Sequence, residues 1–290
     1  MNNTAKSFHD KWTKNETLAF EDTSRPGSDT YNWILTRNGF ADGAALKNFL
    51  EPKKRILDAG CGNGRVTNLL HQHAGQHAQL VGIDLVAADV AKNNLSHLPR
   101  ISTYSKDLLA PLDDLGVFDF IYCQEVLHHT KDPRAGFLNL CTLLEKNGEI
   151  AIYVYKKKAP VREYVDDFIR EKMAPLPYED AIAMSRQITD LGKCLTDLNI
   201  EFDCPAVDAL EIPAGRYTVQ RFLYHFFMKC YWNPELGYEP SAAINYDWYH
   251  PQYATRHTMQ EVLGWFKDAG LSVTHQYEDF YGITVRGKKA

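Results

Sequence analysis

The chain has 290 residues, of which 44% are hydrophobic and 24% are charged, a composition that excludes a wholly disordered protein. Its formal net charge of -5 at pH 7 lacks the overall basic excess of nucleic-acid-binding proteins, so no nucleic-acid partner is expected. No stretch approaches the roughly 18 apolar residues of a membrane-spanning helix, and none of the six cysteines forms a C-x-x-C pair. These features predict a cytoplasmic protein with reduced thiols and no membrane partner.

Residues 1–54 are expected to form an N-terminal helical lead-in. The first 30 residues are polar and end in a stretch rich in helix-breaking residues around Pro26 and Gly27. An apolar pattern then runs from Trp33 to Leu50 at the spacing of one or two helices, and Pro52 ends it.

Between residues 55 and 155, short apolar segments of strand character alternate with amphipathic helical segments. This alternation predicts an α/β fold with a parallel sheet covered by helices on both faces. The expected strands are residues 55–59, 79–84, 101–104, 118–123 and 148–155, and the expected helices are residues 65–73, 86–95 and 134–144.

The alternation stops after residue 155, and residues 156–257 are expected to form a helical, aromatic-rich insertion that selects the substrate. Apolar residues at helical spacing predict helices from Pro160, over about residues 179–199 and over residues 219–231, followed by a loop that includes residues 245–251. The strand–helix pattern returns at a capping box of Thr258 and Glu261. Residues 258–290 are therefore expected to complete the sheet begun by residues 55–155.

A glycine-rich turn, LDAGCGNGR at residues 57–65, connects the first expected strand to the next helix. Glycines tolerate positive φ and let a ligand approach the backbone, and the following helix N-terminus attracts an anionic or nucleotide-like group. Asp84 closes the next strand, where a carboxylate can accept hydrogen bonds from both hydroxyls of a ribose. Asp107 follows the third strand, within reach of an adenine edge.

Two alternatives compete for this turn. A dinucleotide turn has the pattern G-x-G-x-x-G, whose third glycine would fall at Arg65, so the observed G-x-G-x-G spacing disfavours NAD. A tight turn that binds no ligand is the second alternative. Ordering three glycines within five residues costs backbone entropy that a turn without a ligand would not require, and this cost disfavours the second alternative.

With these residues the chain resembles the class I S-adenosylmethionine-dependent methyltransferases, in particular those that act on small molecules. LDAGCGNGR is similar to the first motif of that family, and GIDL at residues 82–85 is similar to its second. SKDL at 105–108, FDFIYCQEVLHH at 118–129 and KNGEI at 146–150 resemble the adenine-contacting turn, the strand-four region and the turn before strand five. The resemblance implies a Rossmann-like sheet of seven strands in the order 3-2-1-4-5-7-6, an antiparallel seventh strand and a helical lid insertion.

The resemblance also implies S-adenosyl-L-methionine as cofactor and S-adenosyl-L-homocysteine as product. Gly60 and Gly62 would lie against the methionine part of the cofactor, and Asp84 would hold its ribose hydroxyls. The whole set of expected cofactor-binding residues is Asp58, Gly60, Cys61, Gly62, Asp84, Leu85, Asp107, Leu108 and Gln124, with Trp33 and Arg37 from the lead-in closing over the cofactor.

Methyl transfer is an in-line displacement at an activated methyl group, so the protein mainly positions the reactants and excludes water. A hydroxyl or amine acceptor can also require a general base. His128 is the first candidate because it lies where the fourth strand opens onto the site, and His129 and Glu125 are the others. The alternative is that these side chains pack against or cap the next helix.

Four residues are expected to face the methyl acceptor: Tyr31, Tyr249, His250 and Arg256. A buried structural role is the alternative for Tyr249 and His250, and a capping role is the alternative for Arg256. No metal site is expected, because the histidines at 71, 73 and 77 lack an acid or cysteine that would complete a ligand set.

The sequence thus supports, as the leading hypothesis, a methyltransferase that modifies oxygen or nitrogen of a small molecule, as a monomer or homodimer. A methyltransferase acting on tRNA or protein is the second hypothesis, which the acidic balance disfavours. The third is a regulator that binds S-adenosylmethionine without catalysis. An NAD-dependent dehydrogenase comes last because of the glycine spacing.

Overall fold

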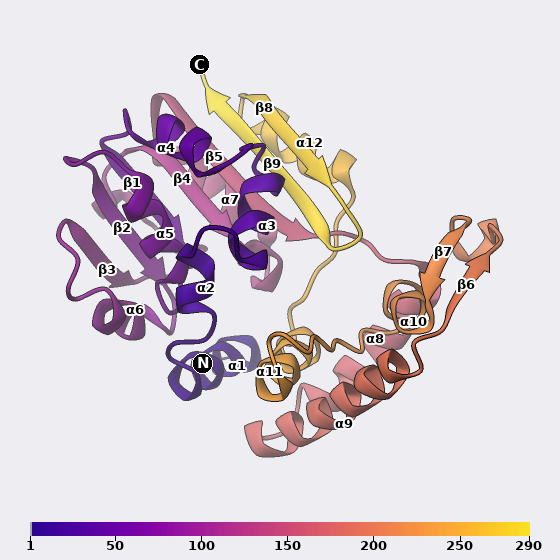
Figure 1. Ribbon diagram of the computed structural model, residues 1–290. Coiled ribbons are helices and arrows are strands. Elements are labelled where there is room, and N and C mark those ends of the chain that lie inside the picture. The colour runs from indigo at the N-terminus through magenta and orange to yellow at the C-terminus, as the bar shows by residue number, and fades with distance from the viewer. Residues whose placement is uncertain (1) are drawn as a thin grey trace. The chain divides into compact units, whose positions relative to one another are not determined.

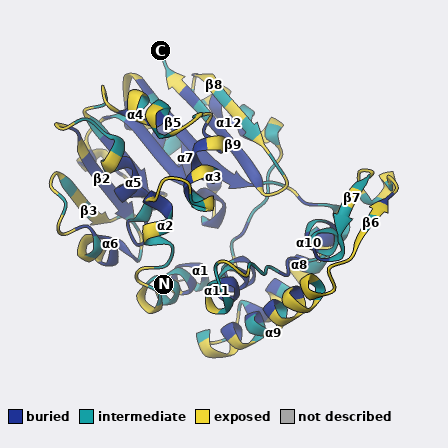
Figure 2. Ribbon diagram, in the orientation of Figure 1, coloured by how far each residue is buried: buried dark blue, intermediate teal, exposed yellow. Residues whose placement is uncertain are grey.

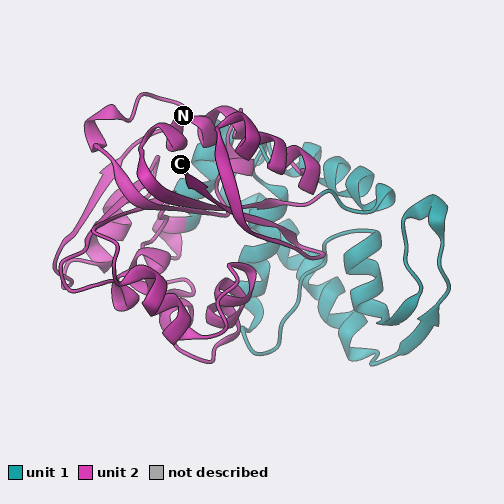
Figure 3. Ribbon diagram, turned by 90° about the horizontal axis from the view of Figure 1, so that it is seen from above, with its two compact units in different colours: residues 1–11, 157–254 teal, residues 12–156, 255–290 magenta. Residues whose placement is uncertain are grey.

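The computed structural model describes residues 2–290, and the chain divides into two compact units (Figure 3). One unit comprises residues 12–156 and 255–290, and the other comprises residues 1–11 and 157–254. We call them the sheet unit and the helical unit. Within residues 2–290 no helix combines the length and the apolar character that crossing a membrane would need.

The sheet unit contains a seven-stranded sheet with helices on both faces (Figure 1). Its strands are β1 (Arg55–Ala59), β2 (Gln79–Asp84), β3 (Ile101–Ser105), β4 (Phe118–Gln124), β5 (Leu144–Tyr155), β8 (Leu271–Glu278) and β9 (Gly282–Lys289). Its helices are α2 (Phe20–Ser24), α3 (Asp29–Arg37), α4 (Gly43–Leu50), α5 (Arg65–His73), α6 (Ala88–Asn94), α7 (Pro133–Thr142) and α12 (Met259–Asp268), with short 3-10 turns η1 (Asp113–Leu115) and η2 (Leu127–His129).

The strand order is β3-β2-β1-β4-β5-β9-β8, so the predicted order 3-2-1-4-5-7-6 is confirmed. The first five strands pair in parallel, and β9, the last strand of the chain, runs antiparallel to both β5 and β8. Strand β1 pairs with β2 on one side and with β4 on the other, so the order of connections reverses there. In open α/β sheets, ligands bind beyond the carboxyl ends of the strands at such a point.

Alternate residues of each strand enter the two opposite cores of the sheet unit. Leu57 and Ile121 pack with Phe137 of α7 and Phe266 of α12 on one face. On the other face, the neighbouring residues in these strands pack against α3, α4 and α5, the members being Ile56, Phe120, Tyr122, Leu35, Leu50 and Leu69. Both faces of the central strands are therefore buried, as Figure 2 shows.

The helical unit contains α8 (Pro160–Met173), α9 (Tyr178–Asp197), α10 (Val219–Phe226) and α11 (Tyr238–Tyr249), a 3-10 turn η3 (Asp208–Leu210), and a two-stranded antiparallel sheet of β6 (Glu201–Cys204) and β7 (Gly215–Thr218). Helix α1 (Asn3–Lys14) begins in this unit. The predicted helices from Pro160 and over 179–199 are confirmed by α8 and α9. The third predicted helix, over 219–231, ends earlier, at Phe226, and the β6–β7 pair was not predicted.

The predicted loop over residues 245–251 is wrong, because residues 245–249 belong to α11. In the structure Tyr246, Trp248 and Tyr249 are all buried. The Asn245 side chain also forms two hydrogen bonds with the Tyr231 backbone. Its Oδ1 accepts from the Tyr231 N–H and its Nδ2 donates to the Tyr231 carbonyl, each at 2.9 Å. Burial of large rings and this side-chain bridge stabilise a helix whose sequence has little amphipathic pattern.

The segment before α3, for which a covering and a loose arrangement are both compatible with the sequence, contains two helices, α1 and α2, within residues 2–28. The predicted helices between Trp33 and Leu50 are confirmed as α3 and α4.

The predicted capping box at the start of α12 is also confirmed. The Glu261 N–H donates to the Thr258 hydroxyl at 3.2 Å, and the Thr258 N–H donates to the Glu261 carboxylate at 2.7 Å. Helix α12 carries Val262 and Phe266, which are fully buried against the sheet, so its first turn helps to anchor the last strands.

We expect Thr258→Ala to lower the free energy of unfolding by about 1 kcal/mol, because the Glu261 N–H at the helix start loses the hydroxyl that accepts from it. Urea titration followed by circular dichroism measures the change. Thr258→Ser keeps the hydroxyl and should lose little of that stability. Equal losses in both variants would contradict the capping role.

Candidate functional site

The carboxyl ends of β1, β2, β3 and β4 meet at one edge of the sheet and bring together most of the predicted cofactor-binding residues. The turn after β1 is built on three glycines with positive φ: Gly60 at 88°, Gly62 at 54° and Gly64 at 87°. L-residues with side chains rarely adopt this conformation, so the course of the turn requires glycine. The N–H groups of Gly60 and Cys61 both donate to the Ile83 carbonyl, at 2.7 and 2.9 Å, and tie the turn to β2.

Glycine is also required here because its neighbours leave no space. An added Cβ at Gly60 would overlap the Val126 side chain, and one at Gly62 would lie 2.9 Å from the Trp12 indole. The turn is thus closed in by a side chain that follows β4 and by one from the N-terminal segment. Asn63 fixes that segment by donating to the carbonyls of Glu16 and Leu18, at 3.0 and 3.1 Å.

Asp84, at the end of β2, is held by three backbone N–H groups. Its Oδ2 accepts from Gly62 at 3.0 Å, and its Oδ1 accepts from Val86 and Ala87, both at 2.9 Å. The carboxylate therefore links the glycine turn to the start of α6 and is oriented before any ligand binds.

Asp58 lies inside this edge of the sheet rather than at its surface. Its side chain is buried, and Oδ2 accepts a hydrogen bond from the Thr67 hydroxyl of α5 at 2.6 Å. Burial raises the pKa of Asp58 from 3.8 to about 7, and the Thr67 hydrogen bond and the positive charge of Arg65 offset part of that rise.

Gln124, the last residue of β4, presents a buried polar group. Its Oε1 accepts from the Tyr122 hydroxyl at 2.7 Å, whereas its Nε2 is buried and has no hydrogen-bond partner in residues 2–290. Buried donors in native proteins are almost always satisfied, so Gln124 Nε2 is a group that a ligand can satisfy.

The other predicted cofactor-binding residues differ in how far they are exposed to solvent. The Cys61 side chain is buried, and its Sγ would lie 3.1 Å from a Cβ added at Gly82. Leu85 is 46% exposed beside Asp84. Asp107 is exposed, and its Oδ1 accepts from the Leu109 N–H at 2.9 Å, while the Leu108 side chain is buried.

Glu125, a candidate base, has a φ of 59°, a conformation that a glutamate rarely adopts. Its carboxylate pairs with Arg65 at 3.2 Å, and Arg65 in turn donates to the Thr23 hydroxyl at 3.1 Å. The strained residue follows β4 directly and turns the chain toward η2, which carries both candidate histidines.

His128 and His129 lie over the end of β5. The His128 ring is fully buried and stacks on Tyr155 with centroids 3.7 Å apart, and the His129 ring meets the same tyrosine edge-on at 5.4 Å. The His128 carbonyl accepts from the N–H and the hydroxyl of Thr255, at 2.9 and 3.2 Å. Contacts on both sides therefore fix the position of this histidine.

Arg256 is half-buried and lies in the chain segment that returns to the sheet. Its neighbour Thr255 binds the His128 carbonyl, and its other neighbour, His257, donates its N–H to the Tyr155 carbonyl at 2.8 Å. The segment that carries Arg256 is thus hydrogen-bonded to the backbone carbonyls of both stacked residues, His128 and Tyr155.

Tyr31, Trp33 and Arg37 all lie on α3. Tyr31 is buried in the core of the sheet unit, with its hydroxyl 3.2 Å from Nε2 of His73. The Trp33 ring packs on Tyr153 of β5 at 5.4 Å. Arg37 stacks over Trp33 at 3.9 Å and pairs with Asp279, and its buried Nη1 has no hydrogen-bond partner in residues 2–290.

Tyr249 and His250 belong to the helical unit, where both are buried and hydrogen-bonded. The Tyr249 hydroxyl donates to Asp166 at 2.8 Å. His250 has its Nδ1 2.7 Å from the Ser7 hydroxyl and its Nε2 3.0 Å from the Leu176 carbonyl. Burial lowers the pKa of His250.

A model of the methyltransferase domain family matches residues 36–276, which is most of the chain. The chain belongs to this methyltransferase family. Its members use S-adenosyl-L-methionine as methyl donor, and this is the cofactor of the chain.

Individual relatives resemble only part of this methyltransferase. A ubiquinone biosynthesis O-methyltransferase of Coxiella burnetii is 32% identical over 100 residues, 33% of this chain and 42% of that protein. An uncharacterized protein of Synechococcus is 32% identical over 154 residues, 47% of this chain and 34% of that protein. The chain thus spans less than half the length of these curated relatives.

Among solved structures, the N-methyltransferase NodS of Bradyrhizobium japonicum, in complex with S-adenosyl-L-homocysteine, aligns with a TM-score of 0.51. The alignment covers 99% of both chains at 14% sequence identity. At this identity the likeness shows that the two methyltransferases share a fold.

Several residues of the methyltransferase site were not predicted from the sequence. Trp12 lies in a polar helix with nothing to mark it, and only the folded chain places its ring against Gly62. Tyr155 could have been found from the sequence, because it ends the fifth strand and, two residues after Tyr153, points to the same face of the sheet. Among residues 2–290, no three His, Cys, Asp or Glu side chains are placed to hold a metal ion.

The raised pKa of Asp58 predicts a stability that depends on pH. Between the usual pKa of 3.8 and the folded value of about 7, the folded protein holds a proton that the unfolded chain has released. The Asp58 contribution to stability is therefore present below about pH 4 and is lost as the pH rises to about 7.

We expect Asp58→Asn, which stays uncharged, to lack this contribution to the pH dependence. Urea titrations between about pH 4 and pH 7 should give a difference from wild type that grows with pH. The exposed Asp113→Asn is the matched control. A constant difference across the range would show that the carboxyl is not buried as described.

Proposed function

We propose that this methyltransferase transfers the methyl group of S-adenosyl-L-methionine to an oxygen or nitrogen of a small-molecule acceptor. The observation that carries the proposal is the glycine turn at the reversal of strand order, together with the Asp84 carboxylate that its backbone orients. The partial identity to an O-methyltransferase of ubiquinone biosynthesis supports a small-molecule acceptor. The acidic net charge of -5 disfavours tRNA as the acceptor.

The residues at the sheet edge fit this cofactor. We assign the ribose hydroxyls to Asp84, whose carboxylate the Gly62 N–H orients, and the packing of the adenine ring to the exposed Leu85. We assign to Asp107, which follows β3, the acceptance of a hydrogen bond from the adenine amino group, and to Leu108 a hydrogen bond donated to the adenine by its backbone N–H. Gly60 and Gly62 let the methionine part approach the backbone closely, while Gln124 Nε2 supplies a buried donor that a ligand oxygen would satisfy.

When bound, the cofactor supplies a methyl group on a sulfonium that is already activated for displacement. The protein then has to orient the acceptor and exclude water. The buried rings of His128, Tyr153 and Tyr155 provide a rigid, water-poor wall beside the end of β4. We assign to His128 the removal of the proton that an acceptor hydroxyl or ammonium must lose, and to Arg256 the contact with an anionic acceptor group.

Glu125 has a different task in this proposal. Its ion pair with Arg65 ties the residue after β4 to the first turn of α5. This pairing supports a role in holding the strained turn before His128 in place, and so in positioning the histidine.

We expect Asp84→Asn to weaken the binding of S-adenosylmethionine and S-adenosylhomocysteine by about tenfold to a hundredfold, because hydrogen bonds to a charged acceptor are lost. Isothermal titration calorimetry measures both affinities. Asp89→Asn, an exposed acid at the start of α6, should leave them unchanged. Binding of NAD in place of both ligands would overturn the assignment of the cofactor.

We expect His128→Gln to lower kcat about a hundredfold for phenolic and amine acceptors, since the proton acceptor is lost, and to leave the affinity for S-adenosylmethionine unchanged. Formation of S-adenosylhomocysteine over a panel of such acceptors is the readout. His97→Gln, on the surface after α6, is the matched control. Unchanged turnover in His128→Gln would exclude it as the base, and cofactor binding without turnover of any acceptor would favour a regulator.

A further inference from the structure

Strand β3 forms one edge of the seven-stranded sheet, and within residues 2–290 its outer side pairs with no other strand (Figure 1). Its bonds to β2 fix the direction of its backbone groups. The Leu80 N–H donates to the Arg100 carbonyl at 2.9 Å, and the Lys106 N–H donates to the Asp84 carbonyl at 3.1 Å. In a parallel ladder such bonds recur at every second residue of the strand. The N–H and carbonyl groups that point away from β2 are therefore those of Ile101, Thr103 and Ser105.

This edge lacks the features that usually protect an unpaired strand. Such an edge is a template for pairing with another chain, and proteins commonly protect it with charges, proline or a β-bulge. The opposite edge strand, β8, has a shift of register between Val273 and His275 and ends at the charged Glu278. By contrast, the β3 sequence ISTYS contains no charged residue and no proline, and its register with β2 is regular throughout.

A groove of about 440 Å³ adjoins the same edge, lined by β3, by the end of α6 and by the turn that follows α6. Its apolar lining residues Leu95, Leu98 and Ile101 belong to one hydrophobic cluster. Lys92 is the one charged residue among those that line the groove. Its ammonium group forms no hydrogen bond or ion pair with the described part of the chain, residues 2–290. The groove thus combines an apolar surface with a positive charge that no acid neutralises.

We propose that the outer edge of β3 and this groove dock an extended segment of another protein, one that carries an acidic and an apolar side chain two residues apart. The segment would add an eighth strand to the sheet by pairing with the outward backbone groups of β3. Alternate side chains of an added strand point to the same face of the sheet. The apolar side chain would lie against Leu95 and Leu98, and the acidic one would pair with Lys92.

The charge of the groove favours this occupant over a second copy of the chain. A second copy that paired through its own β3 would present the residues ISTYS, which include no acid for Lys92. Opposite charges on neighbouring strands stabilise their pairing, so an acidic segment has an advantage that the copy lacks. The site uses none of the residues assigned to methyl transfer, so it is tested separately from the proposed function.

The test follows amide hydrogen exchange of the full chain by NMR while the peptide SETLTES is added. This peptide reads the same in both directions, so either orientation presents leucine between two glutamates to the groove. We expect exchange to slow at least about tenfold at the three outward N–H groups, those of Ile101, Thr103 and Ser105. The N–H groups of Ser102 and Tyr104 face β2 already and should change little.

Three results of this experiment would overturn the proposal. One is the absence of any slowing with the peptide, and another is equal slowing at all five residues, which would show general stabilisation. The third is slowing at the outward N–H groups as the protein concentration rises without peptide, which would assign the edge to a second copy.

Thr103→Pro tests the backbone pairing. It removes an N–H that points away from β2, so the ladder to β2 stays intact, as proline on the open side of an edge strand allows. We expect the affinity for SETLTES to fall at least about tenfold. Thr103→Val keeps the N–H and nearly the same shape, and it should bind the peptide as the wild type does. Equal losses in both variants would contradict pairing through the backbone.

Lys92→Glu tests the charge preference without touching the strand. We expect it to weaken the binding of SETLTES about fivefold and to strengthen the binding of SKTLTKS, in which lysine replaces both glutamates. Lys47→Glu is the matched control, because Lys47 is also exposed in the last turn of a helix of the sheet unit. It should leave both affinities unchanged. Equal effects of the two substitutions would show general surface electrostatics and overturn the role of Lys92.

Discussion

The chain can pass from β1 into α5 only through three residues with positive φ, and the rest of the cofactor site depends on that turn. Because Gly60, Gly62 and Gly64 accept this conformation, the N–H groups of residues 60 and 61 reach the Ile83 carbonyl and the N–H of Gly62 reaches Asp84. One short segment thereby aligns the ends of β1 and β2, orients a carboxylate and leaves backbone exposed to a ligand. Side chains at these positions would collide with Val126, Trp12 or Leu95.

The second half of the site depends on the turn after β4. Glu125 adopts an unfavourable backbone conformation, and its ion pair with Arg65 joins that turn to the helix that the glycine turn begins. Strain of this kind persists when surrounding contacts determine the conformation, as the Thr255 and Tyr155 contacts of His128 do here. Cofactor residues and the candidate base are therefore positioned by one connected set of interactions.

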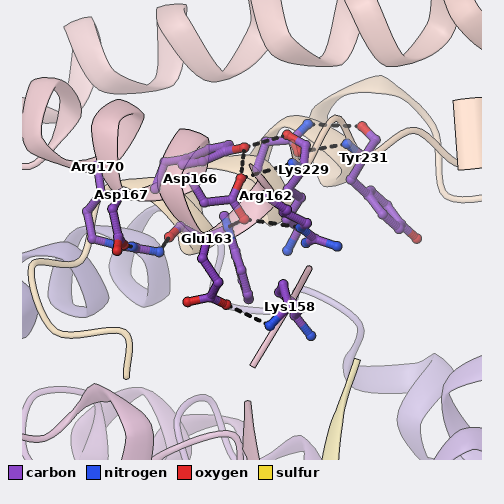
Figure 4. A network of polar contacts seen from close by, with 11 residues as sticks. Lys158, Arg162, Glu163, Asp166, Asp167, Arg170, Lys229 and Tyr231 are labelled. Carbon is purple, nitrogen blue, oxygen red and sulfur yellow. Dashed lines mark hydrogen bonds and ion pairs between the residues drawn. The ribbon is translucent and has the colours of Figure 1, made fainter. Parts of the chain in front are cut away.

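The helical unit differs from the sheet unit in what it buries at its centre. That centre is the Asp166 carboxylate with its four donors (Figure 4) and several cations around the Trp248 ring, in place of the aliphatic layers that cover the sheet. Such a centre fixes the geometry of its members closely, because every donor direction is used. It also responds to charge, which an aliphatic core does not.

The sequence by itself determined the parallel sheet and the kind of group its glycine turn binds, and the resemblance of its motifs to a known family implied the strand order and the cofactor. The reason is that strand and helix periodicity, glycine spacing and the position of Asp84 are local properties of the chain. Only the tertiary structure decided which polar groups become buried. Residues as distant as Trp12 and Gly62, His128 and Thr255, or Asp166 and Tyr249 meet through folding, and no local pattern encodes such pairs. Helix α11 illustrates the same limit, because burial of its aromatic rings, rather than its own sequence pattern, makes residues 245–249 helical.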